Sequence, residues 1–269
     1  MLKNITLGQY FPGDSFLHRL DPRTKLLSTL MLIVIVFVSG GFTGFALILA
    51  FVLLMTRVSG IRLRFLIRGV RPILVIVIFT FILNMFFQSG GRELFRIGPL
   101  RVTDEGLRQA FFLAARLLLL VTSSQLLTLT TSPIELTDGM ESLMRPLTVI
   151  HFPAHEIAMM MSIALRFIPT LLEEANKIMS AQKARGADFD SGNVVRRAKA
   201  MIPLLVPLFV SAFRRAEELA MAMEARCYRG GVGRTRMRRL QYGARDAAAF
   251  LAMFALLGGV IALNILGAF

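Results

Sequence analysis

The stretch AAAFLAMFALLGGVIALNILGAF, residues 247–269, decides the fold class, because it is long, apolar and free of charged side chains. A helix needs about 20 predominantly apolar residues to cross the hydrocarbon core of a bilayer. The rest of the chain has the same character, with 55% hydrophobic residues in a total of 269 and a mean hydropathy of +0.64. Such a composition is too apolar for a soluble domain of this length. The sequence therefore predicts an all-α integral membrane protein.

Four further apolar runs precede this one, at residues 26–38, 42–56, 72–87 and 110–129. We therefore expect about five transmembrane helices. The first two runs are shorter than a spanning helix, so neighbours such as Thr24 and Arg57 are expected to extend them. Asp21 and Pro22 indicate a helix start near residue 22, since Asp is a good N-cap and Pro suits the first helical position.

The distribution of Lys and Arg predicts the orientation of the chain. Four lie before the first run, five lie in residues 57–71 and seventeen lie in residues 133–245. Cytoplasmic segments of membrane proteins carry such an excess, so the N-terminus and residues 133–245 are expected inside and the C-terminus outside. Residues 88–109 also carry four arginines, which weakens the contrast. Residues 1–25 hold no apolar core of signal-peptide type, so no cleaved leader is expected.

A formal net charge of +14 raises the question of nucleic acid. The basic residues mostly flank the apolar runs, however, and that placement favours anionic lipid headgroups and acidic protein partners instead. We therefore expect a lipid bilayer and protein subunits as partners, and no nucleic acid.

Residues 132–245 contain one helical pattern twice, ending in AQKARGAD at residues 181–188 and in AMEARCYRGG at residues 222–231. When Arg185 and Arg226 are aligned, Ala recurs one, four and ten positions before each of them. Apolar residues seven, ten and fourteen positions before each arginine form a helical stripe. Small residues let membrane helices approach closely, so we expect the two helical arms to cross.

The acidic pairs Glu173–Glu174 and Glu217–Glu218 lie near the start of these arms. Paired carboxylates can serve acid–base chemistry, but here they are expected to offset the helix dipole or to pair with basic residues of the arms. Those basic residues are Lys177, Arg214 and Arg215.

Arg185 and Arg226 are expected at the ends of the two arms. Gly186 is a suitable C-cap for the first arm, whereas Gly230 and Gly231 are expected to end the second arm one turn beyond its arginine. An arginine in the last turn compensates the helix dipole, and it can also present a fork of five donors. One such residue is explained by the dipole alone, but the repeat favours two docking points for a partner, where Arg is a frequent hot spot.

The stretch GQYFPGDSFLHRLDPRTKLL, residues 8–27, resembles the N-terminal signature of the transmembrane T component (EcfT) of energy-coupling factor vitamin transporters, the CbiQ/EcfT-like family. The arms resemble the two Ala-Arg-Gly coupling helices of that family. The matching residues are Asp21, Pro22, Arg23 and Lys25 in the leader, Ala184, Arg185 and Gly186 in the first coupling motif, and Ala225, Arg226 and Cys227 in the second. Cys stands at the second glycine position and makes a left-handed backbone costlier there, so the second helix is expected to continue toward Gly230.

The resemblance implies a non-catalytic subunit that binds two ABC-type ATPases (EcfA and EcfA′-like) through these motifs and an S component within the membrane. ATP and Mg would be bound by the ATPases, and this chain would hold no cofactor or metal. ATP-driven closure would be transmitted to the S component, which releases a vitamin or metal ion. Whether the chain serves one S component or several stays open.

The same resemblance implies an organisation in three parts within a prokaryotic cell membrane. Residues 1–131 would hold the N-terminal segment and four transmembrane helices. Residues 132–245 would form long cytoplasmic, amphipathic coupling helices between the fourth and last spans, and residues 246–269 would form the last span.

Two other classes of protein stay open, a membrane-embedded lipid-modifying enzyme and a stand-alone carrier. The five apolar runs contain no Asp or Glu, so a carrier would have no obvious proton or cation relay. The chain has no Gly-Lys-Ser/Thr phosphate loop and no convincing set of catalytic groups for an enzyme. His151 and His155 have a spacing that can bind a metal, but Pro153 between them and the lack of a nearby Cys disfavour a site.

Arg116 is the one charged residue inside an apolar run. An arginine at mid-membrane costs about 2.5–3.5 kcal/mol, so this side chain is expected to pack against a polar loop or to reach the interface. Asn84 and Asn264 are expected to hydrogen-bond between helices.

Overall fold

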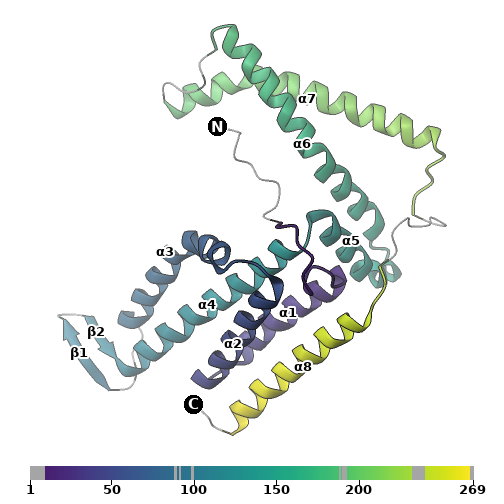
Figure 1. Cartoon of the computed structure of the whole chain (residues 1–269). Coiled ribbons are helices and arrows are strands. Elements are labelled where there is room, and N and C mark those ends of the chain that lie inside the picture. The colour runs from purple at the N-terminus through teal and green to yellow at the C-terminus, as the bar shows by residue number, and fades with distance from the viewer. Residues whose placement is uncertain are drawn as a thin grey trace. The chain divides into compact units, whose positions relative to one another are not determined.

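The computed structural model describes residues 10–87, 90, 92–97, 100–187, 189, 193–231 and 240–266 of the chain. Its elements (Figure 1) are α1 Pro22–Val38, α2 Phe42–Ser59, α3 Leu63–Phe87, β1 Glu93–Ile97, β2 Leu100–Thr103, α4 Asp104–Thr130, α5 Pro133–Met144, η2 Arg145–Ile150, α6 Ala154–Ala184, α7 Val194–Ala225 and α8 Ala244–Ile265. The described parts of residues 8–142 and 239–269 form one compact unit, and those of residues 143–238 form a second. The predicted all-α class is confirmed, and the antiparallel hairpin β1–β2 contains the only strands among the described residues.

Local capping explains where the helices of the first unit begin. Asp21 has an extended backbone and its side chain accepts a hydrogen bond from the N–H of Arg23, while Pro22 takes the first helical position. The expected helix start near residue 22 is therefore confirmed. Thr103 caps α4 in the same way, because its hydroxyl accepts from the N–H of Gly106 at 3.1 Å.

The first unit buries an apolar core among α1, α2, α4 and α8. The fully or nearly buried members of this core are Leu32, Ile35, Val36, Phe45, Ile48, Val52, Leu119, Met253, Leu256 and Val260. A smaller apolar cluster joins the N-terminal stretch before α1 to α3 and α4. Its members are Leu17, Ile61, Leu66, Leu126 and Leu129. Helix α3 packs along α4 and leaves most of its apolar side chains exposed. Exposed apolar surface of this kind suits contact with lipid or with another membrane subunit.

Five of the described helices are long and apolar enough to cross a membrane: α2, α3, α4, α6 and α8. The number matches the expected five spans, but the set differs in two members. Helix α1 has 17 residues, which is short for a spanning helix, although it covers the expected first run. Helix α6 qualifies within residues 132–245, where no span had been expected. Its qualifying 18-residue stretch has a mean hydropathy of 1.3, the lowest of the five, which is consistent with an amphipathic helix.

The second unit consists mainly of α6 and α7, which have 31 and 32 residues. They pack against each other and cross in Figure 1, so the expected crossing of the two arms is confirmed. Pro203 and Pro207 lie inside α7, which continues through both. The two arms are therefore long, continuous rods whose far ends carry the two arginine motifs.

Candidate functional site

The first arm ends in a Schellman motif with Arg185 as its C-cap. Gly186 follows with a φ of +87°, the left-handed conformation that glycine adopts at no steric cost. The N–H of Ala187 donates to the carbonyl of Gln182 at 3.0 Å, and the N–H of Gly186 donates to the carbonyl of Lys183 at 3.0 Å. These two hydrogen bonds satisfy carbonyls that the end of a helix otherwise leaves open.

The second arm ends in the same motif at the equivalent residues. Helix α7 stops at Ala225, Arg226 is the C-cap, and Cys227 takes a φ of +56°. The N–H of Tyr228 donates to Met223 at 3.0 Å, and that of Cys227 donates to Glu224 at 2.8 Å.

The expectation that the second helix continues toward Gly230 is therefore wrong. A left-handed backbone costs a non-glycine residue about 1–2 kcal/mol. The two capping hydrogen bonds, each worth about 1 kcal/mol, offset that cost at Cys227. Gly230 also has a positive φ, but it lies in the chain that follows the helix.

Both arginine tips are exposed. Ala184, Arg185 and Gly186 are exposed at the first tip, as are Ala225, Arg226 and Cys227 at the second. Neither guanidinium makes an ion pair with another residue that the structure describes. The forked donors of the two arginines are therefore open to a carboxylate or a carbonyl cluster on a partner.

The arms cross where Glu174 of α6 meets α7. The Glu174 carboxylate accepts hydrogen bonds from Arg215 Nη2 at 2.9 Å, from Arg215 Nε at 3.3 Å and from the Ser211 hydroxyl. Ala175 is buried beside it at 6% exposed, as expected for the alanine stripe, whereas its equivalent in α7, Ala216, is exposed. The alternative that the acidic residues pair with basic residues of the arms is thus confirmed for Glu174 and Arg215.

The family-signature residues of the N-terminal stretch form one hydrogen-bond network at the start of α1. Both oxygens of Asp21 accept from the Arg23 side chain, from Nε at 3.0 Å and from Nη2 at 3.0 Å. Arg23 is therefore held as a rigid cation rather than as a free arm.

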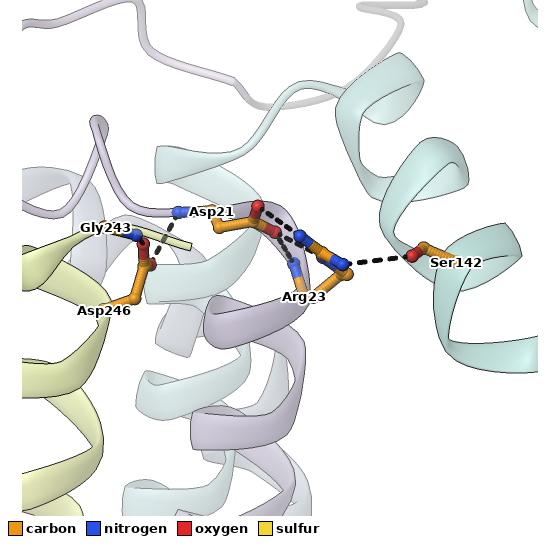
Figure 2. A network of polar contacts seen from close by, with 5 residues as sticks. All are labelled: Asp21, Arg23, Ser142, Gly243 and Asp246. Carbon is orange, nitrogen blue, oxygen red and sulfur yellow. Dashed lines mark hydrogen bonds and ion pairs between the residues drawn. The ribbon is translucent and has the colours of Figure 1, made fainter. Parts of the chain in front are cut away.

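The same network reaches two other helices of the first unit (Figure 2). Arg23 Nη1 lies 3.4 Å from the Ser142 hydroxyl of α5, and the N–H of Asp21 donates to Asp246 Oδ1 of α8 at 2.9 Å. The second oxygen of Asp246 accepts from the N–H of Gly243 at 2.8 Å, which is the N3 half of a capping box, since glycine has no side chain to supply the other half. The signature thus ties α1 to α5 and α8.

Pro22 and Lys25 add further contacts to the network of Asp21, Arg23, Ser142 and Asp246, and together these residues form a brace at the start of α1. A Cβ atom added to Gly139 of α5 would lie 3.0 Å from Pro22 Cβ, so α5 and α1 touch there. Lys25 is 6% exposed, and its ammonium donates to the carbonyls of His18 at 3.1 Å and Thr130 at 2.9 Å.

Sequence reasoning missed Ser142 and Asp246 as members of this network. For Asp246 a local signal exists, because it stands three residues after Gly243 at the start of the last helix, the spacing of a capping box. No comparable signal marks Ser142, because its contact with Arg23 joins residues far apart in the chain.

Arg116 packs against the polar loop after α1, as expected. Its Nη2 lies 3.5 Å from the carbonyl of Ser39, and its guanidinium lies over the rings of Phe37 and Phe45. Asn264 also acts as expected, since its side chain donates across to the carbonyl of Val38 at 2.9 Å. Asn84 differs, because its amide donates to Thr80 of its own helix.

His151 and His155 lie in the second unit on different elements. His151 is the C-cap of η2 with a φ of +60°, and His155 lies in the first turn of α6. A Cβ at Gly231 would lie 2.6 Å from the His155 ring, so the chain after α7 passes close to it. No group of three or more His, Cys, Asp or Glu able to hold a metal ion occurs in the part of the chain that the structure describes.

Comparison with known proteins covers both units. Residues 13–237 match the family model CbiQ, described as cobalt transport protein. A protein of Thermosediminibacter oceani named energy-coupling factor transporter transmembrane protein EcfT is 57% identical over 251 residues, which cover 93% of this chain and 94% of the relative. Relatives with the same name from Clostridium kluyveri and Bacillus subtilis are 54% and 49% identical, and each covers at least 93% of both chains.

Proposed function

This chain belongs to the CbiQ/EcfT family of transmembrane components of energy-coupling factor transporters, and on that premise we propose that it is the scaffold and coupling subunit of an ATP-driven importer. Its two arms dock on two homologous ABC-type ATPases, EcfA-like and EcfA′-like. Its membrane helices and the apolar faces of its arms hold a substrate-binding S component. The substrate is a vitamin or a metal micronutrient, bound by the S component and not by this chain.

One observation supports this proposal above the others. The two arms end in the same Schellman motif, at Arg185 and at Arg226, although the residues at the third motif position differ. A helix end that only needs compensation of its dipole does not require the same cap and an exposed arginine twice. Two matching tips suit two homologous sockets, one on each ATPase, where an arginine fork makes charge-assisted hydrogen bonds.

Exposed apolar surface supports the proposed S-component contact. On α3 this surface includes Val75, Phe79 and Phe87, of which Phe87 is 75% exposed. On α7 it includes Phe209 and Phe213. Large apolar patches on the surface of a protein mark interaction sites, and in a membrane subunit the partner is lipid or another membrane protein. Because such a contact depends mainly on shape and apolar packing, it also allows one S component to be exchanged for another.

The proposed arrangement places the chain in a prokaryotic cell membrane. Helices α1, α2, α3 and α4 of residues 1–131 and helix α8 of residues 246–269 span the bilayer. Residues 132–245, with α6 and α7, lie in the cytoplasm, as does the N-terminus, and the C-terminus is outside. The count of positive residues supports this orientation, because residues 133–245 carry seventeen Lys and Arg.

The proposed mechanism is mechanical. The ATPases bind ATP and Mg and hydrolyse ATP, and this chain binds no cofactor. Closure of the two ATPases on ATP moves the sockets that hold Arg185 and Arg226. Because α6 and α7 are continuous helices of 31 and 32 residues, they transmit this movement as rods to the S component.

Charge reversal at the tips tests this function. The full chain, carrying an affinity tag, is purified from native membranes, and the co-purified ATPase subunits are quantified. Arg185→Glu and Arg226→Glu should each reduce recovery of the ATPases, because each removes charge-assisted bonds worth about 1.5–3 kcal/mol. The double variant should lose more than either single variant, since two-point docking gains from effective concentration.

Arg196→Glu is the matched control, because Arg196 is an exposed arginine in the first turn of α7, outside both coupling motifs. It should leave ATPase recovery at the parental level. If the double tip variant still assembles with two ATPases and still transports at the parental rate, the arms are not the coupling device.

A further inference from the structure

The point where the arms cross is placed symmetrically with respect to the two arginine tips. Arg185 stands eleven positions after Glu174, and Arg226 stands eleven positions after Arg215. At 1.5 Å per residue, each tip lies roughly 16 Å along its helix from the crossing. Glu174 and Arg215 are therefore equivalent positions of the repeated arm, and they contact each other.

The charges at this crossing are opposite, although the positions are equivalent. The first arm carries Glu173–Glu174 where the second carries Arg214–Arg215. When two copies of one rod cross at the same position, identical side chains meet, and identical charges would repel each other. Because one arm carries Glu at this position and the other carries Arg, an ion pair forms in place of that repulsion. The arms of one chain are thus made to pair with each other rather than with copies of themselves.

The geometry of the contact is specific. The Glu174 carboxylate accepts two bonds from the fork of Arg215 and one from the Ser211 hydroxyl, one turn before Arg215 in α7. The side chains of Arg215 and Glu174 are 36% and 24% exposed, so the pair is partly shielded from water. Both Arg215 nitrogens converge on Oε2 of Glu174, and the Ser211 hydroxyl binds Oε1, so each carboxylate oxygen is held by a residue of α7.

We propose that Glu174, Arg215 and Ser211 are positioning residues that lock the crossing of α6 and α7 and so set the separation of the two arginine tips. The purpose of this lock depends on the proposed function, because the lock would present both tips to two ATPases at the correct spacing. Its geometry is a property of this chain alone and can be measured without the ATPases.

The test is a distance measurement between the arms in the full chain, purified in lipid nanodiscs. Spin labels are attached at Ala181→Cys and Ala222→Cys, which are exposed and stand four residues before Arg185 and Arg226. All variants share a Cys227→Gly background, so that the two labels occupy the only thiols. Pulsed electron paramagnetic resonance should give one narrow distance distribution for this parent.

Glu174→Arg and Arg215→Glu each place like charges at the crossing, and each should broaden the distribution or shift its maximum by roughly 5 Å or more, about one helical turn. The exchange Glu174→Arg with Arg215→Glu should restore the narrow distribution, because the ion pair is rebuilt with its direction reversed. Glu173→Arg is the matched control, since Glu173 is the neighbouring acid but is exposed, and it should leave the distribution unchanged. If Glu174→Arg does not yield folded protein, Glu174→Gln should give the same change with a smaller amplitude.

An unchanged distribution in Glu174→Arg, or a failure of the exchange variant to restore the parental distribution, overturns the lock. ATPase co-purification is measured on the same variants. A loss of about tenfold in Glu174→Arg that the exchange variant recovers supports the lock together with its purpose. A broadened distribution with parental ATPase recovery upholds the lock and instead contradicts the coupling role of the tips.

Discussion

Gly186 and Cys227 have the same left-handed backbone conformation at the same position of the two arms, with φ values of +87° and +56°. Each follows the arginine that caps its helix, and each donates its N–H back to the third residue before it. The second arm therefore forms the same Schellman motif, although it has Cys227 where glycine would be favoured. The hydrogen bonds of the cap, and not the identity of the third residue, define where the helix ends.

Replacing Cys227 by glycine should tighten the end of α7, because glycine removes a conformational cost of about 1 kcal/mol. Amide hydrogen exchange at residues 227 and 228 of the full chain should slow by roughly fivefold, the factor that corresponds to such an energy. Cys227→Ala keeps a Cβ atom and serves as the control, with exchange at the parental rate. Faster exchange in Cys227→Gly would contradict the proposed strain.

Conservative changes at the tips should separate charge from geometry. Arg185→Lys and Arg226→Lys keep a positive charge at each helix end but remove the fork of donors. If the sockets bind the guanidinium as a fork, each change should weaken ATPase binding by about tenfold, equivalent to about 1.4 kcal/mol. Titration of the purified ATPases onto the chain in nanodiscs measures this. Parental affinity in both lysine variants would show that a point charge is sufficient.

Asp246 should be more important for stability than its place near the end of the chain suggests. Asp246→Ala leaves the buried N–H of Asp21 without its acceptor, and an unsatisfied buried donor costs about 1–3 kcal/mol. The midpoint of thermal unfolding, measured on the detergent-purified full chain, should therefore fall.

Asp246→Asn is the matched control, since it keeps one acceptor oxygen in nearly the same volume and should lower the midpoint by less. Equal losses in the two variants would mean that the charge of Asp246, rather than the hydrogen bond to Asp21, stabilises the brace.

A methyl group at Gly139 should disturb the contact between α5 and α1. The added Cβ would lie 3.0 Å from Pro22 Cβ and 3.2 Å from the Pro22 carbonyl carbon, and backbone atoms cannot move aside cheaply. Gly139→Ala should therefore lower the thermal midpoint by an amount equivalent to about 1–3 kcal/mol.

Gly258→Ala provides the comparison within α8, because no atom lies within 4 Å of its added Cβ. Alanine favours a helix over glycine by about 0.5–1 kcal/mol, so this variant should be neutral or more stable. If Gly139→Ala is equally well tolerated, α5 is not packed against α1 as tightly as the structure indicates.

Local features of the sequence were sufficient for the class of protein, the helical arms and the place of both arginines. Apolar length and helical periodicity depend only on neighbouring residues, so the number of spans, the start of α1 at Pro22 and the repeated arms could all be predicted. The role of Arg185 and Arg226 in docking stays a prediction, as does the division of the chain into three parts.

The tertiary structure decided how these parts are joined. The hydrogen bond of Asp21 to Asp246 connects residues 225 positions apart, and that of Arg23 to Ser142 connects residues 119 apart. The partner of Glu174 was one of several basic residues that the sequence allowed, and the crossing selected Arg215. Cys227 took the conformation that its side chain disfavours, because two backbone hydrogen bonds outweigh a local preference. In each case the deciding energy comes from contacts that form only when the chain is folded, and a local sequence pattern cannot contain them.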